Sequence, residues 1–124
     1  MTNASIGNDM TVRVLHYALD GLTLQQNAIA NNISNDQTPN YTATEVDFQS
    51  SLQAALKTPS PGTIASTSIY ASPNAPGTDG NNVNLAEELV AASKATLQYQ
   101  AVVTAMNFKF NLLANPMQQP AVTV

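Results

Sequence analysis

The sequence predicts an all-α fold. Two long terminal helices pack as a coiled-coil-like pair, joined by a short helix and a long irregular, partly extended middle loop. Near each end of the chain, apolar residues recur three and four positions apart, the spacing of a helix that buries one stripe. The segment between them has few large apolar residues and many Pro, Gly and Ser. Since 124 residues are enough for one domain, we expect a single unit over residues 1–124.

An N-terminal helix is expected over about residues 9–35. Asn8 or Asp9 can cap its start, and the polar run 31–36 followed by Pro39 ends it. Its heptad positions are Val12, Leu15, Leu19, Leu22, Gln26, Ile29 and Ile33. All of them except Gln26 are aliphatic. A helix of this length exceeds the usual helix of a globular domain, about 11–14 residues.

A C-terminal helix is expected over residues 85–114. Asn84 followed by Glu87 forms a capping box at its start, and Asn115-Pro116 stops it. Its heptad positions are Leu85, Leu89, Ala92, Thr96, Tyr99, Val103, Met106, Phe110 and Leu113. The residues 115–124 then form a tail.

The linker over residues 36–84 is predicted to contain little regular structure. A short helix is expected near residues 47–56, where Phe48, Leu52 and Leu56 share a face. The Pro/Gly/Ser-rich loop over 58–78 is expected to be extended or disordered, with one short strand near Thr67 to Tyr70. Because such a loop and two narrow apolar stripes make a thin core, we expect other chains to complete this fold.

The composition excludes several classes of protein. Four cations in a chain of net charge −4 cannot supply the basic surface of a nucleic-acid binder. The absence of Cys excludes a disulfide scaffold and a thiolate metal site. No apolar run reaches the roughly 18 residues of a transmembrane helix, and residues 1–9 lack the features of a secretory signal. A surface with 14 Asn, 9 Gln and few charges indicates assembly, because charge keeps soluble proteins apart.

No motif in the sequence supports catalysis. His16, the single His, has no positioned partner and is interpreted as a packed or solvent-edge residue. Glu87 and Glu88 are adjacent on a helix, so their side chains point in different directions. We interpret them as surface acids that interact favourably with the helix dipole. The run 79–82 lacks the spacing of a calcium loop and is predicted to be a turn before the Asn84 cap. We therefore expect neither an enzyme nor a catalytic residue, cofactor or metal.

The most distinctive stretch is the polar run after the first helix, residues 32–41. It resembles a signature of bacterial flagellar axial proteins, the rod, hook and hook-junction subunits, whose usual form is Asn-Ile-Ala-Asn-x-x-Thr-Pro-Gly-Tyr. The matching residues are Asn32, Ile33, Asn35, Thr38, Pro39 and Tyr41. Ser34 replaces Ala and Asn40 replaces Gly. Asn40 is expected to keep the left-handed turn, since Asn tolerates a positive φ well.

Three further segments resemble one type of proximal-rod subunit in that family. Residues 46–52 are similar to its Asp-Phe-x-x-x-Leu continuation. Residues 79–85 and 97–101 are similar to the start and middle of its C-terminal helix. The resemblance fails over the loop 58–78, and the tail extends past the usual end of such helices. The alternative is the sister proximal-rod type, FlgC. Its C-terminal segment typically lacks the Tyr-Gln pair that is present here within residues 97–101.

The resemblance implies a structural subunit that polymerises helically into a torque-transmitting drive shaft and encloses an export channel. The implied partners are further copies of the chain, rod proteins of the FlgC, FlgF and FlgG types, the rod–MS-ring adaptor FliE and the flagellar export gate. Neither a nucleic acid nor a small-molecule substrate is implied. The implied location is the basal-body rod spanning the periplasm, reached through type III export without a cleavable signal.

On this interpretation, the two helices pack within and between subunits, and the motif fixes the bend after the first helix. The packing residues are Leu15, Leu19, Leu22, Ile29, Ile33, Leu89, Tyr99, Val103, Met106 and Phe110. The motif residues are Asn32, Asn35, Thr38, Pro39, Asn40 and Tyr41. A cytoplasmic coiled-coil adaptor would explain the heptads but not the motif. An export chaperone or secreted effector would also be helical, but the motif is not expected there.

Overall fold

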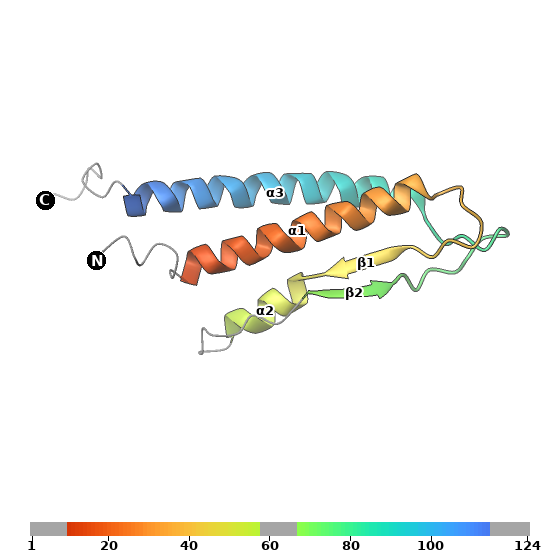
Figure 1. Cartoon of the computed structure of the whole chain (residues 1–124), viewed down its shortest axis with the longest axis horizontal. Helices are drawn as coiled ribbons and strands as arrows, with labels where there is room; N and C mark the ends of the chain where they lie inside the picture. The colour runs from red at the N-terminus through yellow and green to blue at the C-terminus, as the bar shows by residue number, and fades with distance from the viewer. Residues whose placement is uncertain (1–9, 58–66, 115–124) are drawn as a thin grey trace, which may run out of the picture.

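Two long helices run side by side along the chain (Figure 1). The computed structural model describes residues 10–57 and 67–114. Helix α1 spans Met10–Ser34 and α3 spans Leu85–Ala114, so both predicted helices are present close to their expected bounds. The proposed cap at Asn8 or Asp9 and the stop at Asn115-Pro116 lie outside the described residues.

A two-stranded sheet and a short helix cover the other side of α1, which therefore forms the middle layer (Figure 1). Strand β1 spans Thr44–Asp47, helix α2 spans Gln49–Lys57 and strand β2 spans Ser68–Ala71. The prediction of an all-α fold is wrong in this respect. Strand β2 matches the predicted short strand near residues 67–70, whereas β1 was not predicted. Its partner lies 24 residues along the chain, and a local pattern carries no signal for such a pairing.

The strands are antiparallel, with Glu45 opposite Tyr70 and Val46 opposite Ile69. Side-chain amides of α1 occupy the outer edge of β1. Asn32 Nδ2 donates to the Thr44 carbonyl at 2.9 Å, and Gln25 Nε2 donates to the Val46 carbonyl at 2.9 Å. These amides take the place of a third strand, so β1 is fixed against α1 on one edge and β2 on the other.

The core lies where α1, α2 and α3 meet. Its buried residues are Ala18, Leu22 and Phe48, with Tyr17, Leu52, Tyr99 and Val102 packed around them. The rings of Tyr17 and Phe48 meet edge to face with centroids 6.4 Å apart. Gly21 lies directly against the Phe48 ring, because a Cβ at Gly21 would overlap the ring atoms. Because position 21 has no side chain, the layer formed by β1, α2 and β2 can pack closely against α1.

The face of α3 that turns inward differs in part from the predicted heptad stripe. The side chains that are buried or half-buried follow a 4-3 spacing through Glu88, Ala92, Ala95, Tyr99, Val102, Met106 and Lys109. Leu85, Leu89 and Phe110, which belong to the predicted stripe, are exposed in the single chain. Ala95 is only 2% exposed, so a small residue occupies the most buried described position on α3.

The linker is more ordered than predicted where it is described. Helix α2 begins at Gln49, two residues later than expected, because Asp47 caps it: Ser50 N donates to Asp47 Oδ1 at 3.0 Å. The hydrogen bonds from Ser50 hold the pKa of Asp47 below its usual value. Ser72 N donates to the Ala43 carbonyl and Gly77 N to the Asn81 carbonyl, so residues 72–81 form a defined loop. Residues 58–66 of the predicted loop lie outside the described part.

Candidate functional site

Asn32 joins the end of α1 to the start of β1. Its side chain is 1% exposed, so every polar atom requires a protein partner. Besides donating to the Thr44 carbonyl, it accepts hydrogen bonds at Oδ1 from Thr44 N at 3.0 Å and from Tyr41 Oη at 3.1 Å. The first and last residues of the motif segment are thus joined directly, which fixes the direction in which the chain leaves the helix.

The middle of the motif ends the helix. Asn35 Nδ2 donates to the Asn31 carbonyl at 2.9 Å, and Thr38 Oγ1 donates to Asn35 Oδ1 at 3.0 Å. The Asn35 side chain thus adds a second hydrogen bond to the Asn31 carbonyl, which also accepts from Asn35 N, and Thr38 holds that side chain in place. Pro39 is exposed in the turn that follows. This arrangement agrees with the prediction of a helix stop followed by a fixed turn.

Asn40 has a φ of 61°, which confirms the left-handed conformation expected from the sequence. Its backbone N–H donates to the Asp79 carbonyl at 2.9 Å. The next residue in that second loop, Gly80, also has a positive φ, of 81°. A turn is present close to the predicted residues 79–82, but its backbone hydrogen bond joins Gly80 N to the Gly77 carbonyl, two residues earlier than expected, and it contacts the motif directly.

Asn81 and Asn82 connect the motif to the segment before α3. Asn81 Nδ2 donates to the Asn35 and Thr38 carbonyls at 2.8 and 2.7 Å. Asn82 Oδ1 accepts from Ala43 N at 2.7 Å. Both side chains are buried. We call these two residues, with Asn32, Asn35, Asn40 and Tyr41, the asparagine cluster.

Sequence reasoning missed the roles of Asn81 and Asn82. The turn prediction assigned them no contacts, although two adjacent amides before a helix cap were a usable signal.

The capping box at Asn84 is half confirmed. Glu87 N donates to Asn84 Oδ1 at 3.2 Å, but the Glu87 carboxylate accepts from Asn74 Nδ2 at 3.1 Å rather than returning to the cap. The carboxylate is thus used to hold the 72–81 loop against α3.

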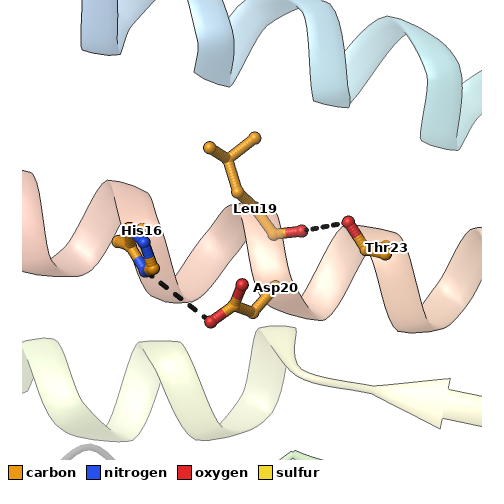
Figure 2. Close-up of polar contacts among 4 residues, drawn as sticks. All are labelled: His16, Leu19, Asp20 and Thr23. Atoms are coloured by element: carbon orange, nitrogen blue, oxygen red, sulfur yellow. Dashed lines mark hydrogen bonds and ion pairs between the residues drawn. The ribbon is translucent and has the colours of Figure 1, made fainter.

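The predicted packing residues of α1 are all at least half-buried in the chain itself. Leu22 is 1% exposed and belongs to the core. Leu15, Leu19, Ile29 and Ile33 are half-buried. In Figure 2, Leu19 points toward α3, so this part of the helix supports the packing of the helix pair.

The predicted packing residues of α3 divide between its two sides. Met106 is buried, and Tyr99 and Val103 are half-buried. Leu89 and Phe110 are exposed. On the side facing away from α1, Val90, Leu97 and Phe108 are 69%, 67% and 65% exposed. We call Val90, Leu97 and Phe108 the outer face of α3.

At 100° per residue, Val90, Leu97 and Phe108 lie within about 20° of one another on the helix, and Lys94 lies about 40–60° to one side of them. Single exposed apolar residues are common on protein surfaces, but a row of them along one helix marks a surface that binds protein. The chain alone provides nothing among its described residues to cover this row.

A groove of about 250 Å³ between α1, β1 and α3 carries three carboxylates, those of Glu45, Glu87 and Glu88. Partial burial raises the pKa of Glu88 above its usual value, and the charges of Glu45 and Glu87 raise it further. A hydrogen bond from Asn32 opposes these effects. Tyr70 and Lys94 also line this groove, and a hydrogen bond to Glu45 raises the pKa of Tyr70 above its usual value.

His16 lies on the exposed side of α1. Figure 2 shows two polar contacts on this helix. Thr23 Oγ1 donates to the Leu19 carbonyl at 2.9 Å. The Nδ1 atom of His16 is 3.6 Å from Oδ2 of Asp20, which lies one helical turn further along the chain. The contact is a surface pair between residues i and i+4. His16 therefore belongs at the solvent edge, one of the two positions expected for it.

Within the described ranges, no helix is both long enough and apolar enough to cross a membrane. In the same part of the chain, no three His, Asp or Glu side chains converge in a way that could hold a metal ion.

Comparison with known proteins gives a consistent result. No family model matches the chain. The chain is 37% identical over 115 residues to the flagellar basal body rod protein FlgB of Bacillus subtilis strain 168, covering 83% of this chain and 89% of that protein. It is 30% identical over 98 residues to FlgB of Cereibacter sphaeroides, covering 67% and 74%. It is 27% identical over 130 residues to FlgB of Escherichia coli K12, covering 89% and 94%.

Proposed function

Because the chain belongs to the FlgB family of flagellar basal body rod proteins, we propose that it is a structural subunit of the proximal rod. In this role it polymerises helically into the drive shaft between the MS ring and the distal rod, transmits torque and encloses the channel for exported subunits. The relatives described above carry the FlgB name, which favours this type over the sister FlgC type.

The observation that carries the proposal is the outer face of α3. Val90, Leu97 and Phe108 are each about two-thirds exposed. They line a helix whose opposite side already packs on α1. At roughly 25 cal/mol per Å² of apolar surface, covering such a row with neighbouring subunits stabilises an assembly by several kcal/mol. A torque-bearing polymer requires this kind of rigid, dry contact between helices.

The asparagine cluster has a complementary role in the proposal. It fixes the end of α1, the start of β1 and the segment before α3 relative to one another, through buried amide hydrogen bonds. Buried and fully paired polar networks specify one geometry. Each subunit would therefore present the same outer surface to its neighbours, as a regular helical lattice requires.

The proposed partners are further copies of the chain, rod proteins of the FlgC, FlgF and FlgG types, the adaptor FliE and the export gate. The proposed mechanism is mechanical, with no enzymatic step and no cofactor. The subunit would reach the rod through the flagellar type III export apparatus.

The direct test is mass spectrometry of hook–basal-body particles purified from the source cell. We expect this chain in stoichiometric amounts together with the other rod proteins. If the other rod proteins are found and this chain is absent, the proposal fails. A cytoplasmic coiled-coil adaptor would then be the better hypothesis, and it predicts a stable helical oligomer of the isolated chain by circular dichroism and light scattering.

A further inference from the structure

The register of the hairpin shows which backbone groups of β2 turn away from β1. Thr44 and Val46 direct their backbone groups away from β2, toward side-chain amides of α1. Hydrogen-bonding directions alternate along an antiparallel pair, so the residues of β2 opposite these two also turn away from β1. By the register they are Ala71 and Ile69. Each presents one N–H and one carbonyl, and we call this row of backbone groups the outer edge of β2.

The outer edge of β2 is open among the described residues. Within the described ranges, no hydrogen bond reaches the backbone of Ile69 or Ala71 from that side. All four residues of the strand are exposed, with Ile69 at 58% and Tyr70 at 45%. Natural edge strands are usually protected by charged residues, Pro or a bulge, and Ser68–Ala71 has none of these. An edge of this kind can accept an additional strand from a binding partner.

The surface beside this edge is negatively charged. Tyr70 lines the groove described above together with Glu45, Glu87, Glu88 and Lys94, which are three carboxylates and one ammonium. The hydrogen bond to Glu45 is the largest effect that raises the pKa of Tyr70, and the negative charge of that carboxylate raises it further. Because opposite charges stabilise each other, a cation placed beside Tyr70 would be favoured.

A third strand on β2 would bring one of its side chains to this groove. The residue opposite Tyr70 would lie on the same face of the sheet as Tyr70 and Glu45, which are themselves opposite each other. Neighbouring strands are about 4.8 Å apart, so the Cα atom of that residue would lie about 10 Å from the Cα atom of Glu45. The long side chain of a Lys or Arg can span this distance together with the carboxylate.

This chain cannot supply the third strand to its own copies. Its four cations, Arg13, Lys57, Lys94 and Lys109, all lie in helices. The outer edge of β1 is occupied by side-chain amides, so it cannot pair with β2 of a copy. Pairing of β2 with β2 of a copy uses the same edge twice and requires a two-fold axis. The polymer proposed above repeats one orientation of the subunit along a helix, which provides no such axis.

We propose that the outer edge of β2 binds an extended segment of a different protein as a third strand, with a Lys or Arg of that segment opposite Tyr70. This inference rests on the proposed function, because it assigns an outside partner to an edge that pairing between copies does not use. Backbone hydrogen bonds at Ile69 and Ala71 hold the strand, and the carboxylates of the groove select the cation. The hairpin lies across α1 from α3, so one subunit can pack on neighbours through α3 and still present this edge (Figure 1).

The first measurement is amide hydrogen exchange of the isolated full chain, followed by NMR. We expect the amides of Ile69 and Ala71 to exchange at the rate of unstructured backbone. The amide of Tyr70 points toward β1 and should exchange at least about tenfold more slowly. Equal protection of the three amides would show that the chain itself covers the edge, and it would overturn the proposal.

The partner is identified in purified hook–basal bodies from cells in which the variant replaces the native chain. The chain contains no Cys, so Ala71→Cys gives a single attachment point for a maleimide that carries a benzophenone photocrosslinker. We expect crosslinks to one segment of a different protein, with a Lys or Arg within about two residues of the crosslink. The matched control, Asn27→Cys on the exposed side of α1, should not give this product. Crosslinks only to copies of this chain, or to a segment without a cation, would overturn the proposal.

Two further substitutions test the backbone and charge contacts separately in the Ala71→Cys background. Ile69→Pro removes an outward N–H but no hydrogen bond to β1, so it should lower the crosslinked fraction at least about threefold, whereas Ile69→Val should not. Glu45→Lys repels a cation and should lower the fraction by about the same factor, whereas Asp20→Lys on the exposed side of α1 should not. Glu45→Lys leaves the backbone unchanged, so it decides the charge contact even if Ile69→Pro loosens the hairpin. An unchanged crosslinked fraction in both variants would overturn the proposal.

These outcomes are distinct from a failure of the proposed function. If the unmodified chain is absent from the particles, the proposed function fails. If the chain is present and position 71 gives only crosslinks to copies of the same chain, the third strand from a different protein is overturned and the proposed function stands.

Discussion

Asn40 lies against Gly80 where the loop after α1 meets the loop before α3. Both residues have a positive φ, of 61° and 81°. A Cβ at Gly80 would overlap the Oδ1 atom of Asn40, and Asn40 N donates to the carbonyl of the preceding residue, Asp79. The Asn side chain at position 40 is therefore compatible with this contact only because position 80 has no side chain.

Gly80→Ala should destabilise the fold by about 2–4 kcal/mol, because it combines left-handed strain with an overlap against Asn40. Adding Asn40→Gly removes the overlap but not the strain, so the double variant should recover part of the loss. A double-mutant cycle of thermal unfolding, followed by far-UV circular dichroism, measures this coupling. Strictly additive effects would contradict the contact.

Gly21→Ala should lower the free energy of unfolding by about 1–2 kcal/mol. An Ala in a helix normally gains about 1 kcal/mol over Gly, but here the added methyl meets the Phe48 ring. Gly77→Ala is the matched control, since its Cβ would lie at ordinary contact distance, 3.5 Å from the Asn81 carbonyl. Urea unfolding of the two variants distinguishes them. A stabilised Gly21→Ala variant would show that the helix and Phe48 are further apart.

Asn32→Ala should cost about 2–4 kcal/mol, because it leaves the Thr44 backbone groups and the Tyr41 hydroxyl without their partner in a buried site. The neighbouring Asn31→Ala changes an exposed helical position and should shift stability by less than about 0.5 kcal/mol. The same urea titrations measure both. Equal effects at the two positions would argue against a special role for Asn32.

Glu88→Gln should stabilise the chain at neutral pH. The folded state raises the pKa of Glu88, so ionised Glu88 opposes folding above that value. The advantage of Gln should shrink as the pH falls from the raised pKa toward the ordinary value near 4.5. Asp47→Asn is the control of opposite sign. Its lowered pKa stabilises the fold above about 3.8, and that contribution is lost in acid. Unfolding free energies measured from neutral to acidic pH test both signs.

Leu97→Asp should abolish assembly without unfolding the chain. Leu97 is 67% exposed, so the free energy of unfolding should change by less than about 0.5 kcal/mol. In the rod the new charge would be buried against a neighbour, at a cost of several kcal/mol. We expect at least a tenfold loss of the chain from purified basal bodies and loss of swimming. Asn27→Asp adds the same charge to the exposed side of α1 and should be tolerated.

Local signals in the sequence were sufficient for some elements and insufficient for others. The start of α3 follows from the Asn84 cap, and the conformation of Asn40 follows from its tolerance of a positive φ. Strand β1 could not be predicted, because Thr44–Asp47 is a strand only through its pairing with β2 and its amide contacts to α1. The parts that Asn81 and Asn82 play in the cluster depend on backbone groups about 40 residues away.

The sequence by itself determined two long helices, the stop and left-handed turn after the first, and a resemblance to flagellar axial proteins. These depend on periodicity, capping and motif, which act over a few residues. Only the tertiary structure decided which side of α3 packs inward. The heptad prediction weighted Leu89 and Phe110, whereas in the single chain both are exposed and the small Ala95 is only 2% exposed. Helix packing is governed by how near two backbones can come, and small side chains permit the shortest distance. The large side chains of Val90, Leu97 and Phe108 are left exposed on the outer face, where we propose that other subunits cover them.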